Sequence, residues 1–106
     1  MKVILKRRNS NINAVGEYNP ETNELTVLSG SVVSGTIRQT EKFRGAKSIF
    51  KSRANVVVDG RTVVDVHFKS ASTAANFVTG SSTNGLTAWK TEDGKTIKEY
   101  LSQASR

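Results

Sequence analysis

Hydrophobic and polar residues alternate along the first third of the chain, as in strands that bury one face. Val3 and Leu5 alternate with polar neighbours, and this segment ends in Lys-Arg-Arg. A second segment runs from Ile12 to Tyr18, where Gly16 is typical of a β-bulge, and a third runs from Glu24 to Leu28. Turn-forming Asn, Ser and Pro residues separate the three segments. We therefore predict an antiparallel meander of three strands.

The middle of the chain has the spacing of an amphipathic helix from Glu41 to Arg53, although Gly45 weakens it by about 1 kcal/mol relative to alanine. The apolar residues at helical spacing are Phe43, Ala46, Ile49 and Phe50. The preceding segment, Ser31 to Thr40, fits either an extension of the third strand or a loop.

A β-hairpin is predicted around Asp59-Gly60, because this pair supplies the positive φ angles of a type I′ turn. Its arms are Asn55 to Val58 and Thr62 to Phe68. Because side chains alternate between the two faces of a strand, three residues of the second arm are predicted to face the core: Val64, Val66 and Phe68. The other set, Val63, Asp65 and His67, faces away.

Two helices are predicted near the C-terminus from their capping residues. Ser70 is a good N-cap for a helix over Ala71 to Thr79, and Gly80 stands where a helix ends. This helix would pack through Ala74, Ala75, Phe77 and Val78. Thr96 and Glu99 form a capping box at the start of the last helix, whose buried stripe would hold Ile97, Tyr100 and Leu101. The predicted fold is α+β: a small antiparallel sheet, made of the three-stranded meander plus the hairpin, covered on one face by two to three short helices.

Length and composition narrow the class of protein. A chain of 106 residues predicts a single domain over residues 1–106. The absence of cysteine excludes disulfides, thiolate nucleophiles and Cys-type zinc sites. The apolar run from Val3 to Leu5 is too short for a signal peptide, and no stretch approaches the ~20 apolar residues of a membrane helix. We therefore expect a cytoplasmic protein with no membrane partner.

Charge makes a polyanion the expected partner. Sixteen Lys and Arg against nine Asp and Glu give a net charge of +7. The densest basic run lies between Arg38 and Arg53, and Glu41 is the only acidic residue in this segment of the sequence. The cations of the run are Arg38, Lys42, Arg44, Lys47, Lys51 and Arg53. On a helix Arg44, Lys47 and Lys51 would form one ridge that could follow phosphates. The alternative is a solvated helix face whose long side chains cover a small core.

A second candidate site is the loop from Ser81 to Gly85 together with Trp89, the only tryptophan. Backbone N–H groups and the indole ring could hold a nucleotide or a modified base. The alternative, which we favour, is a tight turn at Asn84-Gly85 and a tryptophan that fills the core. Ser82 and Asn84 remain candidate contacts in either case.

No constellation in the sequence predicts catalysis. His67 and Asp65 share one strand face, but a metal site or a general base would need a third ligand or a nucleophile, and none is evident. No phosphate-binding glycine loop is present. We expect no catalytic residue, no metal and no cofactor, and therefore no enzyme.

Six short motifs, in order along the chain, resemble the domain-of-unknown-function 4357 family. They are Gly16-x-Tyr18, Val27-Leu28-x-Gly30-Ser31, Phe68-x-Ser70-x-Ser72-x-Ala74-Ala75, Gly80 with Asn84-Gly85, Trp89-Lys90, and Asp93-Gly94-Lys95-Thr96. The resemblance runs from about Val3 to Leu101. The family is similar in turn to the RAMA domain, which is associated with restriction enzymes and adenine methylases.

The chain departs from the family pattern in three places. Ala71 replaces the proline of Ser-Pro-Ser, Ser81 stands where an arginine is common, and Thr36 to Val58 matches poorly. The resemblance implies a noncatalytic accessory module that works near DNA in nuclease or restriction–modification systems. The alternative is a module that docks on a nuclease or methylase and uses its charge for solubility only.

The expected nucleic-acid contacts combine the basic segments with the loop. They are Lys6, Arg7, Arg8, Arg38, Arg44, Lys47, Lys51, Ser82, Asn84 and Lys90. The sequence predicts neither an oligomeric state nor a base preference.

Overall fold

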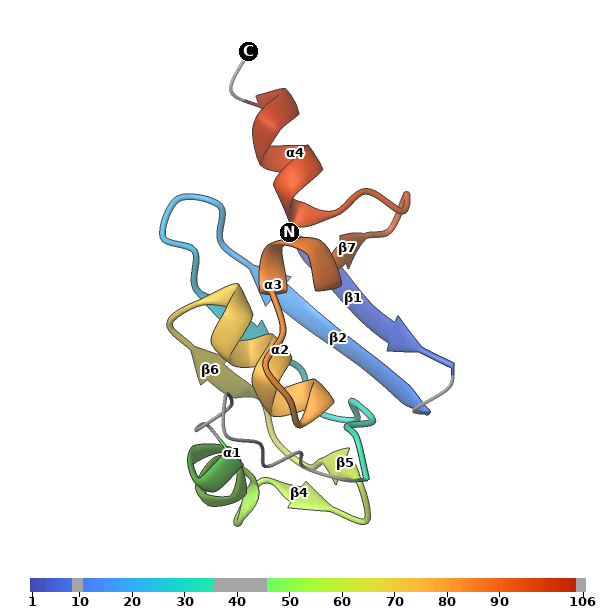
Figure 1. Ribbon diagram of the computed structural model, residues 1–106, viewed down its shortest axis with the longest axis vertical. Helices are drawn as coiled ribbons and strands as arrows, with labels where there is room; N and C mark the ends of the chain where they lie inside the picture. Colours follow the sequence, from blue (N-terminus) through green and yellow to red (C-terminus); the bar gives the residue numbers. More distant parts are fainter. Residues whose placement is uncertain (9–10, 36–45, 105–106) are drawn as a thin grey trace.

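The computed structural model describes residues 1–8, 11–35 and 46–104, and it shows an α+β fold (Figure 1). Over this part of the chain, a five-stranded antiparallel sheet has the order β6-β3-β2-β1-β7, and β4 and β5 form a separate hairpin. The strands are β1 (Lys2–Arg7), β2 (Ile12–Tyr18), β3 (Leu25–Val27), β4 (Val57–Val58), β5 (Arg61–Thr62), β6 (Val66–Phe68) and β7 (Lys90–Thr91). The helices are α1 (Ala46–Arg53), α2 (Ala71–Thr79), α3 (Gly85–Ala88) and α4 (Ile97–Ala104). The predicted fold class is confirmed.

The three-stranded meander is confirmed, but the bulge predicted at Gly16 is wrong. Gly16 pairs with Val3 on one side and with Val27 on the other, and neither ladder contains an extra residue. A Cβ atom at Gly16 would lie 2.8 Å from Leu25 Cδ2 and 3.2 Å from the carbonyl oxygen of Thr26. Glycine is therefore present because side chains pack closely over the sheet at this point.

One face of the sheet and the helices enclose the core. In Figure 1, α2 and α3 lie in front of the sheet, whereas α1 and α4 lie at opposite ends of the molecule. Trp89 is fully buried, and its Nε1 donates a hydrogen bond to the carbonyl oxygen of Ala71 at 3.1 Å. The interpretation of Trp89 as the filler of the core is confirmed, and its use as an exposed stacking ring is wrong.

The hairpin turn is confirmed, but its second arm is not one strand. Asp59 and Gly60 have φ angles of 51° and 77°, as a type I′ turn requires. After Thr62 the chain bends, leaves β4 and joins the large sheet as β6. Val64 lies in the bend and is 47% exposed, so its predicted place in the core is wrong. The bend is fixed by the Asp65 carboxylate, which accepts a hydrogen bond from the N–H of Ser29 at 2.8 Å.

The predicted caps of α2 are confirmed. The Ser70 side chain accepts from the N–H of Thr73, and Gly80 ends the helix with a φ of 72°. The four residues predicted to pack inward are all buried: Ala74, Ala75, Phe77 and Val78.

The capping box of α4 is also confirmed, because Thr96 and Glu99 bond to each other's backbone N–H. Ile97 is buried and Leu101 is half-buried, but Tyr100 is 37% exposed and does not belong to the buried stripe. No helix within the described ranges is long and apolar enough to cross a membrane.

The segment after β3 continues as isolated bridges. Val32 pairs with Asn13 on one side and with Arg61 on the other, so it joins the large sheet to the hairpin. Part of the predicted middle helix is observed as α1, while residues 41–45 lie outside the described residues.

Candidate nucleic-acid interface

The face of the sheet that points away from α2 and α3 is here called the open face. Directly opposite residues of paired strands share a face, so Val3, Gly16 and Val27 lie toward the core, and Ile4 and Val15 lie on the open face. Ile4 and Val15 are half-buried and form its apolar centre. The exposed residues of the open face are Lys2, Lys6, Asn13, Glu17, His67 and Lys90.

Three exposed cations lie in a row across the open face. Lys90 pairs with Ile4, and Lys6 stands two residues further along β1, so the two lysines are diagonal neighbours at about 7–8 Å. Lys6 pairs with Asn13, which bridges to Val32 and through it to Arg61. Three strand spacings of about 4.8 Å put Arg61 roughly 14 Å from Lys6. We call Lys90, Lys6 and Arg61 the basic row.

None of these three cations forms an ion pair with another residue in the described part of the chain. Arg8 is exposed and follows the end of β1, whereas Arg7 pairs with the buried Ile12 and therefore belongs to the opposite face of the sheet. The structure therefore brings two predicted contacts, Lys6 and Lys90, together on the open face from segments far apart in the sequence. Arg61 was missed, because only the two bridges of Val32 reveal that it shares this face.

The predicted cation ridge on the middle helix is only partly described. Lys51 is exposed on α1, and Lys47 belongs to the same helix. Arg38 and Arg44 lie outside the described residues. In Figure 1, α1 lies near the β4–β5 hairpin and away from the end of β1.

Arg53, which the sequence counted among the free cations, is half-buried and holds α1 against α2. Its Nε donates to the carbonyl oxygen of Phe77 and its Nη1 to that of Ser34, both at 3.0 Å. Nη2 donates to the carbonyl oxygen of Val78 at 3.3 Å, and the guanidinium lies 5.7 Å from the centre of the Phe77 ring. Burial lowers the pKa of Arg53. Its spacing of four from the buried Ile49 was the available signal for this role.

The loop between α2 and α3 uses its N–H groups internally. Ser81 donates to the Thr79 hydroxyl at 3.3 Å, and Thr83 donates to Asn76 Oδ1 at 2.8 Å. The Asn84 side chain accepts from the N–H of Leu86 at 3.0 Å, as the N-cap of α3. Three N–H groups of the predicted cradle, those of Ser81, Thr83 and Gly85, are therefore used within the fold, and Asn84-Gly85 begins α3 and does not form an isolated tight turn. Ser82 and Asn84 are exposed on this loop.

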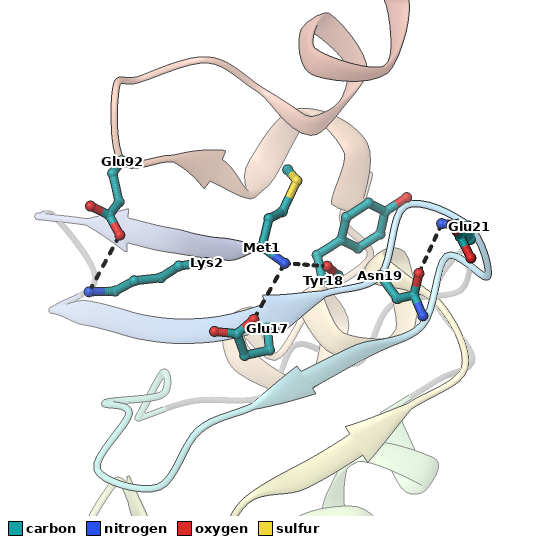
Figure 2. A network of polar contacts seen from close by, with 7 residues as sticks. All are labelled: Met1, Lys2, Glu17, Tyr18, Asn19, Glu21 and Glu92. Atoms are coloured by element: carbon teal, nitrogen blue, oxygen red, sulfur yellow. Dashed lines mark hydrogen bonds and ion pairs between the residues drawn. The ribbon is translucent and has the colours of Figure 1, made fainter. Parts of the chain in front are cut away.

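At the end of the open face away from the basic row, charges are paired. The Met1 nitrogen donates to the carbonyl oxygen of Tyr18 at 2.8 Å and lies 3.4 Å from the Glu17 carboxylate (Figure 2). Lys2 Nζ lies 3.8 Å from the Glu92 carboxylate (Figure 2).

His67 belongs to the same end of the open face. Its Nε2 lies 3.3 Å from Glu24 and its Nδ1 3.1 Å from the Thr26 hydroxyl. Asp65, by contrast, bonds to the N–H of Ser29. Within the described residues no three His, Cys, Asp or Glu side chains are grouped to hold a metal ion.

A hollow of about 540 Å³ opens between the start of β1, the turn after β7, and α4. Its lining includes Lys2, Thr91, Asp93 and Tyr100. Thr91 donates a hydrogen bond to Asp93, and this bond is the main reason that the pKa of Asp93 lies below its ordinary value. We call this space the α4 hollow.

One protein-family model matches the chain. It is the model described as Domain of unknown function (DUF4357), and it covers residues 5–101. This match confirms the resemblance predicted from the six motifs. No curated protein and no solved structure matches the chain.

Proposed function

The chain belongs to the family described as Domain of unknown function (DUF4357), and we propose that it is a noncatalytic accessory module that binds nucleic acid, with DNA as the preferred form. The observation that carries this proposal is the basic row: three exposed cations on one face of the sheet that form no ion pair with any other residue the structure describes. The module would act in the cytoplasm, in nuclease or restriction–modification systems, as the family resemblance implies.

The basic row suits phosphates because its cations are exposed and can exchange water and counterions for phosphate oxygens. Each such contact releases condensed counterions, which favours binding and makes the affinity fall as salt is added. The opposite end of the open face carries the carboxylate of Glu92 beside Lys2 and that of Glu24 beside His67, and these carboxylates reduce its attraction for a polyanion. A bound strand would therefore lie along the basic row, with Arg8 extending the contact beyond the end of β1.

The open face supports contact with the backbone of the nucleic acid more than reading of its sequence. Its apolar centre, Ile4 and Val15, is half-buried within the sheet and offers no hydrogen bond to a base edge. Phosphate contacts position a protein on nucleic acid but carry no sequence information. We therefore expect weak dependence on base sequence at the basic row.

Salt-dependent binding tests this proposal. The double variant Lys6→Gln/Arg61→Gln removes two charges from the basic row, and the control Lys69→Gln/Lys98→Gln removes two exposed charges elsewhere. Binding of a labelled 16-bp duplex is measured by fluorescence anisotropy over a series of salt concentrations. For the first variant we expect the slope of log K against log salt to shrink by roughly 2, since each contact contributes about 0.9. The control should keep the parent slope.

Two results would contradict the proposed interface. Equal weakening in both double variants would mean that only the net charge attracts the duplex. A slope reduced by Lys51→Gln, but not by the basic-row variant, would move the interface to α1.

A second function, docking on a nuclease or methylase, is favoured by a group of exposed valines. Val58, Val63 and Val64 are 56%, 52% and 47% exposed, and they lie on the hairpin or directly after it. Apolar side chains gathered at a surface are typical of protein contacts. Lack of binding to DNA and RNA, single- or double-stranded, at low salt would favour this second function.

A further inference from the structure

The α4 hollow presents an aromatic ring that the fold leaves uncovered. The other aromatic side chains for which the structure gives an exposure are 8% exposed or less: Tyr18, Phe68, Phe77 and Trp89. Tyr100 is 37% exposed and lines the hollow with Met1, whose side chain packs against the core. At about 540 Å³ the hollow falls within the range of small-ligand sites, roughly 300–1,000 Å³.

The polar lining of the hollow favours a neutral group with hydrogen-bond donors over a phosphate. Two carboxylates, Glu92 and Asp93, and two cations, Lys2 and Lys95, line it, so its lining side chains carry no net charge. Both cations already have partners: Lys2 lies 3.8 Å from Glu92 (Figure 2), and Lys95 Nζ donates to Gln103 Oε1 at 2.8 Å. The carboxylate oxygens can accept hydrogen bonds. A flat ring with exocyclic amino groups matches both the tyrosine ring and these acceptors.

The hollow adjoins the strands that carry the basic row. Thr91 lines the hollow and directly follows Lys90. Lys2 lines it too, and four residues of extended β1, about 13 Å, separate Lys2 from Lys6. A strand whose phosphates follow the basic row can therefore reach the hollow with its next bases.

We propose that the α4 hollow binds one unpaired base of a single-stranded nucleic acid, stacked on the ring of Tyr100 and bonded through its amino edge to the carboxylates. This inference rests on the proposed function and deepens it. The basic row would hold phosphates of single or double strands alike. The hollow would add affinity only where a base is free to leave its stack, because paired bases within a duplex cannot reach it.

Substitution of Tyr100 separates the contribution of the α4 hollow from that of the basic row. Tyr100→Leu removes the stacking surface, while Tyr100→Phe keeps it and serves as the matched control. Binding of a 12-nucleotide single strand and of a 16-bp blunt duplex is measured by fluorescence anisotropy at one low salt concentration. Thermal unfolding shows whether each variant is folded.

For Tyr100→Leu we expect single-strand affinity to fall roughly fivefold to a hundredfold, since a base on an aromatic ring contributes about that much. Duplex affinity should stay within about twofold, and Tyr100→Phe should match the parent on both probes. Unchanged single-strand binding by a folded Tyr100→Leu, with binding still weakened by Lys6→Gln/Arg61→Gln, would overturn the base site and leave the proposed function standing. Lack of binding to either probe by the parent protein would overturn both.

Discussion

Gly85 is the residue at which α3 meets the first turn of α2. Its N–H donates to Ser72 Oγ at 3.0 Å, so the two backbones lie in direct contact. A Cβ atom at this position would lie 2.2 Å from the carbonyl carbon of Ala71 and 2.4 Å from the N atom of Ser72. The neighbours are backbone atoms and cannot turn aside as a side chain would. The contact also fixes the core, because the Ala71 carbonyl accepts the indole N–H of Trp89.

The first prediction is that Gly85→Ala destabilises the protein. The added methyl group must push α3 away from α2, and such overpacking costs about 1–3 kcal/mol or more. The control is Gly35→Ala, since no atom of the described residues lies within 4 Å of a methyl group added at Gly35, whose φ is not positive. Urea denaturation gives the free energy of unfolding of both variants. A Gly85→Ala protein as stable as Gly35→Ala would contradict this account of the α2–α3 contact.

At the scale of helices and strands, the features predicted correctly from the sequence are caps and turns that depend on nearby residues only. The cap at Ser70, the capping box at Thr96 and the turn at Asp59-Gly60 all form as predicted, because each depends on side chains within a few residues. Val64 and Tyr100 were wrongly predicted to be buried, because their burial depends on whether a distant segment covers them. The periodicity of the sequence contains no information about such distant contacts.

The same reasoning explains the family motifs and the site. Ser72, Gly85 and Trp89, which helped to carry the resemblance, make the contacts between α2, α3 and the core. The motifs at these positions therefore preserve packing. Lys6 and Lys90 could be predicted as basic residues, but their shared face follows from the β1–β7 pairing, which no local pattern encodes.

The second prediction concerns the bend that divides the hairpin from β6. The buried Thr62 hydroxyl donates to the carbonyl oxygen of Leu28 at 2.9 Å and accepts from the N–H of Ser31 at 3.0 Å. Thr62→Val keeps the shape of the side chain but removes the hydroxyl partner of the Leu28 carbonyl and of the Ser31 N–H. We therefore expect the free energy of unfolding to fall by about 1–3 kcal/mol. Val64→Thr makes the reverse exchange at an exposed position, and we expect it to change the free energy of unfolding by no more than about 0.5 kcal/mol.

Thermal or urea unfolding of the two variants measures both effects. If Val64→Thr were the more damaging change, Val64 would have to be buried as alternation predicted.

At the scale of the whole molecule, Arg53 joins α1 to the rest of the fold. Its guanidinium donates to carbonyls at the C-terminal end of α2 and to Ser34, which lies in the segment after β3. Three parts of the chain therefore meet at one side chain. The basic row is assembled in the same way, since β7, β1 and β5 each contribute one cation. In both cases the tertiary fold determines what a charged residue does, and the number of charges near it in the sequence does not.

The third prediction is that Arg53→Met loosens α1 without loosening the sheet. Methionine keeps most of the apolar stem but donates no hydrogen bond, so the α2 carbonyls lose a charged partner whose bonds typically contribute about 1.5–3 kcal/mol. Native-state hydrogen exchange should show amides of α1 exchanging roughly tenfold to a hundredfold faster, while the amides of β1 and β2 keep the parent rates. The control Lys51→Met removes an exposed cation from the same helix and should change neither set. Faster exchange of the same factor in α1, β1 and β2 would instead mean that Arg53 stabilises the molecule as one cooperative unit, and that α1 has no separate opening.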